Sequence, residues 1–135
     1  MSRIYIIRKF KYYILLLILL SIANTIKADY PVFWQRYTAD PWGIEYDGRL
    51  YLFCSHDTYE SGKGYGYFMN DITCISTDDM KNWTDHGEVF SAKDSKWGAN
   101  MTWAPCVVYK DRKFYLYYGN GLSGIGVAVG DSPTG

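Results

Sequence analysis

The sequence has little that would bind a metal or cross a membrane. It contains three cysteines, and their spacing matches no metal-ligand motif. No serine triad, phosphate-binding loop, or zinc or calcium cluster is recognisable. The longest apolar run, residues 12–23, is about 12 residues long, whereas a membrane-spanning helix needs roughly 20. We therefore expect no cofactor, no metal site and no stable membrane insertion.

Residues 1–28 have the pattern of a signal peptide. A basic start precedes the apolar run, and the small residues Ala23 and Ala28 are candidate cleavage points. A buried or membrane-anchoring helix is the alternative interpretation, and the shortness of the run argues against it. The pattern predicts that the rest of the chain, residues 29–135, is secreted or periplasmic.

The charge balance argues against a nucleic-acid partner. Five of the 14 basic residues lie within residues 1–28, whereas all 14 acidic residues lie beyond them. The remaining chain therefore carries 9 basic and 14 acidic groups, a net charge of −5, and it shows no basic patch.

Each cysteine lies in an apolar, strand-like run. We interpret Cys54, Cys74 and Cys106 as buried free thiols, which is how unpaired cysteines commonly pack. A disulfide between Cys54 and Cys74 across neighbouring strands is the alternative in an oxidising compartment.

Short apolar segments separated by turn residues predict an all-β fold. Residues 44–46 and 50–55 flank Asp47-Gly48, a strong hairpin signal. Further strands are expected at residues 68–77 and 84–90, and no helix is expected after the signal segment. Four antiparallel strands in about 50 residues are the size of one blade of a β-propeller.

The hairpin region occurs twice in the chain. Residues 41–54 align without gaps on residues 105–118, with matching residues Pro41 and Pro105, Asp47 and Asp111, Tyr51 and Tyr115, and Leu52 and Leu116. The second copy continues through a strand expected at residues 125–129, with no fourth strand after it. We therefore expect one and three-quarter blades, the N-terminal part of a longer propeller.

Six short motifs, in order, carry a resemblance to one family. They are Thr-Ala-Asp-Pro at residues 38–41, Tyr-Leu-Phe-Cys-Ser-His-Asp at 51–57, Asn-Trp-Thr-Asp-His-Gly at 82–87, Trp-Ala-Pro at 103–105, Ile-Gly-Val-Ala-Val at 125–129 and Asp-Ser-Pro-Thr-Gly at 131–135. Together they resemble glycoside hydrolase family 43 across residues 29–135. The resemblance implies a five-bladed β-propeller of the arabinofuranosidase or β-xylosidase type, which cleaves O-glycosidic bonds of plant polysaccharides with inversion.

The resemblance assigns one catalytic residue to this chain. Asp40, in its Asp-Pro context, matches the general base that activates water. The general acid and a pKa-tuning aspartate of the family are expected after Gly135, so the 135 residues alone should lack useful activity. We expect Pro41 to hold Asp40 extended. The alternative is a turn aspartate that stabilises its own backbone.

Three further residues are candidates for binding an arabinose- or xylose-containing saccharide. His56 and Asp57 end a strand that faces the pocket in related enzymes, although a polar turn would explain them equally. Trp103 offers an aromatic face to a sugar, although packing between blades would explain it equally.

Two other functions compete with a family 43 hydrolase. One is a carbohydrate-binding or interaction propeller without catalysis, which the Asp-Pro motif disfavours. The other is a neighbouring five-bladed family that acts on fructans and usually opens on Asn-Asp-Pro, whereas Ala39 precedes Asp40 here.

Overall fold

The computed structural model describes residues 12–14, 31–58, 68–99 and 101–135. The chain divides into two compact units, Met1–Pro31 and Val32–Gly135. In the first unit residues 12–14 are helical, and the rest of the expected signal peptide up to residue 28 lies outside the described residues. Within the described part, no helix is both long and apolar enough to cross a membrane.

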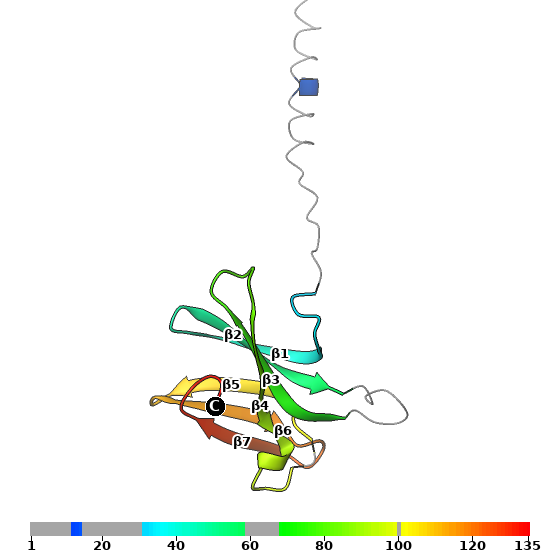
Figure 1. The fold of residues 1–135 in the computed structure, drawn as a ribbon, viewed down its shortest axis with the longest axis vertical. Coiled ribbons are helices and arrows are strands. Elements are labelled where there is room, and N and C mark those ends of the chain that lie inside the picture. Colours follow the sequence, from blue (N-terminus) through cyan, green and yellow to red (C-terminus); the bar gives the residue numbers. More distant parts are fainter. Residues whose placement is uncertain (1–11, 15–30, 59–67, 100) are drawn as a thin grey trace, which may run out of the picture. The chain divides into compact units, whose positions relative to one another are not determined.

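The first sheet of the second unit has four antiparallel strands in chain order. They are β1 (Tyr37–Tyr46), β2 (Arg49–Asp57), β3 (Met69–Thr77) and β4 (Thr84–Ser91). Each strand pairs with the one before it, which gives the twisted meander in Figure 1. All four expected strands are present, but β1 begins at Tyr37, well before the expected start at Ile44, whereas the ends of the other three strands differ only slightly from the expectation.

The second sheet repeats the first with three strands. They are β5 (Trp103–Lys110), β6 (Lys113–Gly119) and β7 (Ile125–Gly130), again in chain order and antiparallel. A short 3-10 helix, η1 (Ala92–Asp94), begins the connection between the sheets. The expectation of no helix after the signal segment was wrong at η1, because a single turn carries no periodic pattern that a sequence can reveal.

Both hairpins turn through left-handed backbone. The turn between β1 and β2 has φ 52° at Asp47 and 73° at Gly48, as the Asp-Gly pair predicts for a type I′ turn. The matching turn between β5 and β6 has φ 52° at Asp111 and 60° at Arg112. The repeat thus keeps the turn geometry although an arginine replaces the glycine.

The turn between β3 and β4 is organised by one carboxylate. Asp79 accepts hydrogen bonds from the backbone N–H groups of Asn82 and Lys81 (2.7 and 2.8 Å) and from the Thr77 hydroxyl (3.1 Å). These bonds favour the ionised form and hold the pKa of Asp79 well below its usual range. Asp79 is therefore a structural turn residue.

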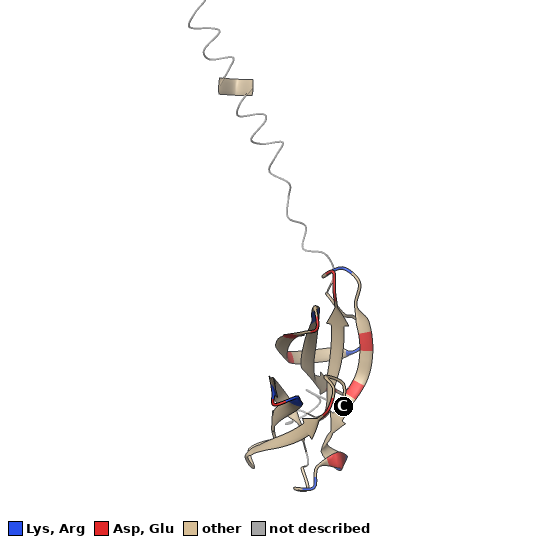
Figure 2. Ribbon diagram, turned by 90° about the vertical axis from the view of Figure 1, so that its left-hand side faces the viewer, with Lys and Arg blue, Asp and Glu red and all other residues tan. Residues whose placement is uncertain are grey.

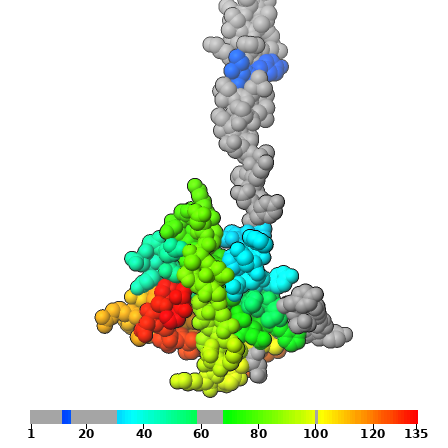
Figure 3. Space-filling view, viewed as in Figure 1, coloured from blue at the N-terminus to red at the C-terminus, as the bar shows by residue number. Residues whose placement is uncertain are grey.

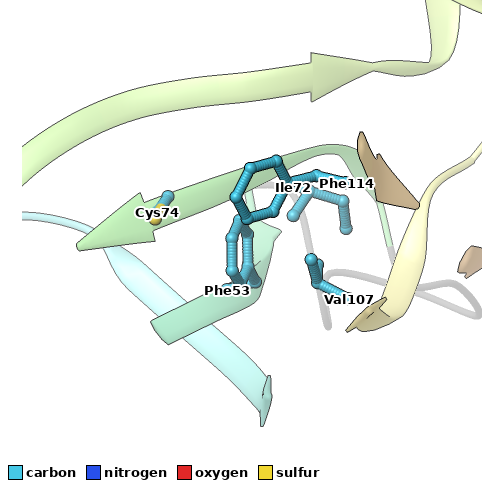
Figure 4. Close-up of a cluster of buried hydrophobic side chains, with 5 residues drawn as sticks. All are labelled: Phe53, Ile72, Cys74, Val107 and Phe114. Atoms are coloured by element: carbon cyan, nitrogen blue, oxygen red, sulfur yellow. The ribbon is translucent and has the colours of Figure 1, made fainter. Parts of the chain in front are cut away.

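The core lies between the two sheets. Phe53 of β2 and Ile72 and Cys74 of β3 pack against Val107 of β5 and Phe114 of β6 (Figure 4). Aromatic contacts extend this core. Tyr46 packs edge-on against Tyr109 and Phe114, and Phe90 packs against Tyr118. Because large apolar side chains come from both sheets, the core fixes how one sheet sits on the other.

The end of the chain lies beside the first sheet. In Figure 3 the C-terminal residues, in red, lie next to the green surface of that sheet. A cavity of about 110 Å³ lies between them, with Phe90 of β4 and Pro133 among its lining residues. This cavity is mostly apolar and belongs to the packing between the sheets.

All three cysteines are free thiols in the structure, and Cys54 and Cys74 are buried as expected, but Cys106 is only half-buried. Cys54 pairs with Thr73, and Cys74 pairs with Phe53, so the two cysteines occupy opposite faces of the first sheet. A disulfide between them is therefore excluded by the strand register. Burial raises the pKa of the Cys54 thiol to about 11 and that of the Cys74 thiol to about 12.

Candidate active site

Asp40 lies at a β-bulge near the start of β1. Ala39 pairs with Ser55 and Trp42 with Phe53, so two residues of β1, Asp40 and Pro41, lie opposite one residue of β2. The φ of Asp40 is 49°, in the left-handed region. The expectation that Pro41 holds Asp40 extended was therefore wrong. The bulge demands a left-handed residue, and aspartate is one of the few types that enter this region readily.

The second copy contains the same bulge without the carboxylate. Ala104 has φ 47° and lies at a register shift between Trp103 and Cys106. Alanine has no side-chain oxygen with which to stabilise its backbone. The bulge geometry therefore does not depend on a carboxylate, which weakens the interpretation of Asp40 as a turn aspartate.

A buried serine joins the two bulges. The Ser55 side chain is fully buried, and its Oγ donates to Asp40 Oδ2 at 2.9 Å. The same Oγ accepts from the backbone N–H of Ala104 at 2.8 Å. Asp40 itself is exposed. Sequence reasoning missed Ser55, although the alternation of β2 places it on the same face as the buried Phe53.

His56 pairs with an aspartate on the neighbouring strand. Its Nδ1 lies 2.9 Å from Asp71 Oδ1 and 3.1 Å from Asp71 Oδ2. The His56 side chain is 27% exposed and that of Asp71 13%, so the ring is accessible while its partner is largely covered. A carboxylate at Nδ1 favours a proton on that nitrogen and orients the ring. No local signal in the sequence pointed to Asp71, which lies near the start of β3.

Asp57 and Trp103 complete the same end of the molecule. Asp57, half-buried, ends β2 opposite Tyr37 and Met69. Trp103 begins β5, where its indole lies directly over Gly119. The N–H of Thr102, just before it, donates to Met69 O at 2.8 Å.

These contacts gather the expected site residues. The start of β1, the end of β2 and the start of β3 lie together because neighbouring strands are antiparallel, and two hydrogen bonds attach the start of β5 to them. Asp40, His56, Asp57 and Trp103 therefore share one end of the two sheets. Among the described residues, no hydrogen bond connects His56 to Asp57. The carboxylate that contacts His56 is that of Asp71.

The charges around the sheets are mixed. Figure 2 shows acidic and basic residues interspersed along the ribbon of the described residues. The ionised Asp40 adds to burial in raising the pKa of Cys54. Within residues 31–58, 68–99 and 101–135, no three His, Cys, Asp or Glu side chains group closely enough to hold a metal ion.

Two copies of one antiparallel sheet, packed face to face with a carboxylate at a strand bulge, define part of a β-propeller with a polar site at one end. The profile of glycosyl hydrolases family 43 matches residues 29–135. The chain belongs to this family.

Several of the similar proteins are named for activity on arabinose- or xylose-containing saccharides. The chain is 42% identical over 124 residues to an arabinoxylan arabinofuranohydrolase of Paenibacillus polymyxa, covering 78% of this chain and 19% of that protein. The structure of an α-L-arabinofuranosidase from Clostridium thermocellum is 63% identical, with a TM-score of 0.64, over 80% of this chain and 36% of that one. A family 43 enzyme of Xanthomonas citri, in complex with xylose, aligns with a TM-score of 0.70 at 34% identity, over 80% of this chain and 33% of that one.

The alignments also show how much of a relative the chain represents. It spans between 19% and 38% of the curated relatives it matches. Its two sheets match part of a five-bladed propeller, so the fold class expected from the sequence is confirmed.

Proposed function

We propose that the chain is the base-bearing part of a secreted, inverting glycoside hydrolase that removes arabinofuranosyl or xylosyl units from plant polysaccharides. Asp40 is its general base. The observation that carries the proposal is the exposed Asp40 carboxylate at a bulge whose backbone an alanine reproduces in the second copy. A carboxylate that the local fold does not need is free to serve chemistry.

The surroundings of Asp40 suit a general base. Ser55 occupies one carboxylate oxygen, Oδ2, and the other oxygen can receive a proton from water. An inverting glycosidase needs this base on one face of the sugar and a carboxylic acid on the other, about 6.5–9.5 Å away. By family resemblance, that acid and the aspartate that tunes its pKa belong to parts of the relatives that this chain does not match. The water then attacks the anomeric carbon as the acid protonates the leaving oxygen.

The neighbouring residues suit the holding of a sugar. The His56 ring, oriented by Asp71, presents its second nitrogen to a ligand, and Asp57 offers a carboxylate at the same strand end. Trp103 supplies an aromatic wall of the kind that packs on sugar C–H surfaces. The related Xanthomonas citri structure holds xylose, which supports a pentose as the ligand class.

Secretion remains part of this proposal. A basic start followed by a short apolar run supports a signal peptide in residues 1–28, which would deliver the enzyme to polymers outside the cytoplasm.

The test is a hybrid enzyme. Residues 29–135 of this chain replace the matching part of the Clostridium thermocellum arabinofuranosidase, whose 63% identity favours correct assembly. The expected result is that Asp40→Asn lowers kcat/KM on an aryl arabinofuranoside by about 100- to 10,000-fold, since that is what general base catalysis contributes.

Asp47→Asn is the matched control. Asp47 also has a left-handed backbone, with φ 52° against 49° for Asp40, but it lies in the hairpin turn just after β1, at the opposite end of that strand from Asp40. This variant should keep the activity of the hybrid. Activity of the Asp40→Asn hybrid equal to that of the control would contradict the proposal. Oligosaccharide binding by a folded hybrid with no turnover at all would favour a carbohydrate-binding propeller instead.

A further inference from the structure

We propose that Ser55 is a positioning residue for Asp40, and that it ties the catalytic carboxylate to the backbone of the second sheet. This inference rests on the proposed function of Asp40. Ser55 is fully buried, and the role we assign to it acts only through the carboxylate. The argument starts from the direction of its two hydrogen bonds.

The two bonds of Ser55 have only one consistent direction. The backbone N–H of Ala104 can only donate, so Ser55 Oγ accepts there, at 2.8 Å. The ionised Asp40 carboxylate can only accept, so the single hydroxyl proton of Ser55 points to Oδ2, at 2.9 Å. The hydrogen bond from the Ala104 amide therefore sets the orientation of the Ser55 hydroxyl group. The hydroxyl group in turn sets the orientation of the Asp40 carboxylate.

Burial makes this arrangement rigid. Ser55 is fully buried and pairs across the sheet with Ile72, which is also fully buried. Water does not compete for a hydroxyl in such a place, and a hydrogen bond there is stronger than one in solvent. Asp40, by contrast, is exposed and would rotate about its side-chain bonds without this contact.

The second sheet is a stable anchor because other bonds hold it nearby. Trp42, two residues after Asp40, donates from Nε1 to Val107 O at 2.9 Å. The N–H of Thr102, two residues before Ala104, donates to Met69 O at 2.8 Å. The hydrogen bonds of Ser55 lie between these two inter-sheet hydrogen bonds. The position of the Asp40 carboxylate is therefore fixed relative to a part of the second sheet that cannot shift freely.

Positioning of this kind has a kinetic signature. A general base that is slightly misplaced reduces the rate of the chemical step while substrate binding is unchanged. In the hybrid enzyme we expect Ser55→Ala to lower kcat by roughly 10- to 100-fold with KM changed less than about twofold. Ser55→Thr keeps the hydroxyl and should recover most of the lost kcat.

Ser76→Ala is the matched control. Ser76 is also fully buried, accepts a hydrogen bond from Arg49 Nε at 3.1 Å and contacts His86, but lies near the hairpin end of the sheet. Both alanine variants should lose thermal stability, and only Ser55→Ala should lose kcat. Equal kcat in the two would overturn the proposal, while loss of activity in Asp40→Asn alone would leave the proposed function standing.

A second variant covers a failure of Ser55→Ala to fold. Ser55→Cys preserves the shape closely, but a thiol is a weak donor. A folded Ser55→Cys hybrid with reduced kcat and unchanged KM supports the proposal, and one with full kcat contradicts it.

Discussion

His86 shows how a single side chain can be held in one protonation state by its neighbours. Its Nε2 lies 2.7 Å from Ser76 Oγ, and that oxygen already accepts from Arg49 Nε at 3.1 Å. Which of the two atoms donates depends on the tautomer of the His86 ring, because a hydroxyl oxygen can accept from two partners. Burial, and then the Arg49 charge, lower the pKa of His86 below its usual value.

The lowered pKa of His86 makes stability depend on pH in a defined direction. The unfolded chain, with a histidine pKa near 6.5, binds more protons than the folded chain, so the contribution of His86 is full above about pH 6.5 and is lost as pH falls through the lower folded value. We expect His86→Gln to reduce the drop in Tm of the hybrid between pH 7.5 and pH 5. Identical pH profiles for the variant and the unmodified hybrid would contradict this.

For single residues, the sequence could identify candidates for the site but not the partners that they contact. Asp40 and Asp47 have almost the same φ, and a preference for aspartate at left-handed positions applies to both. Their difference lies in Ser55, which donates to Asp40 from the neighbouring strand and accepts from Ala104 of the second sheet. Likewise Asp71 reaches His56 only after the strands have paired. Such partners depend on register, which residue type does not encode.

Among the elements, the end of β6 is shaped by a glycine. A Cβ on Gly119 would lie 2.5 Å from Trp103 Nε1, closer than any carbon atom can approach. The indole therefore rests on bare backbone, and β6 holds Trp103 in the place where we propose that it lines the sugar site. This glycine is needed for its lack of a side chain, as where two groups approach closely.

We expect Gly119→Ala to displace the Trp103 indole. Overpacking of this kind typically costs about 1–3 kcal/mol. The measurement is the urea unfolding of the hybrid, followed by tryptophan fluorescence, together with KM for an oligosaccharide. Gly130→Ala is the control, since a Cβ there would meet its nearest atom at 3.4 Å. Unchanged stability and KM in Gly119→Ala would show that Trp103 has room to move.

The strands themselves were largely predictable. The Asp-Gly turn, the gapless repeat and the β-branched and aromatic runs located all seven strands. The bulges at Asp40 and Ala104 were not foreseen, because Pro41 argues for an extended predecessor and the bulge is imposed by pairing with the next strand. The turn η1 was missed because three residues carry no period.

For the whole molecule, the second sheet presents an apolar outer face. The exposed side chains on it are Val108, Tyr117, Ile125, Val127 and Val129. The repeat aligns Val108 with Ile44 and Tyr117 with Phe53, and both of these pack between the two sheets of this chain. The outer face of the second sheet is thus equivalent to the face of the first sheet that is buried between the sheets. The chain spans 36% of a related enzyme.

We propose that this chain supplies the general base and that another part of the enzyme supplies the general acid, which gives a prediction for the chain alone. The 135-residue chain should show no useful turnover of aryl arabinofuranosides or xylosides, because we assign it the base but no proton donor. Joined to the remaining part of the Clostridium thermocellum enzyme, it should turn over. Release of sugar from equal concentrations of the two proteins is the measurement. Comparable rates would mean that a donor lies among these residues.

The paired bulges have a consequence for protein engineering. A duplicated unit has kept a costly left-handed strand start in both copies, yet only one copy carries a carboxylate there. The conformation is therefore not specific to the chemistry that we assign to Asp40. Ala104 is exposed and already adopts the backbone that aspartate tolerates, so it offers a prepared position for installing a second acidic group without redesigning the strand.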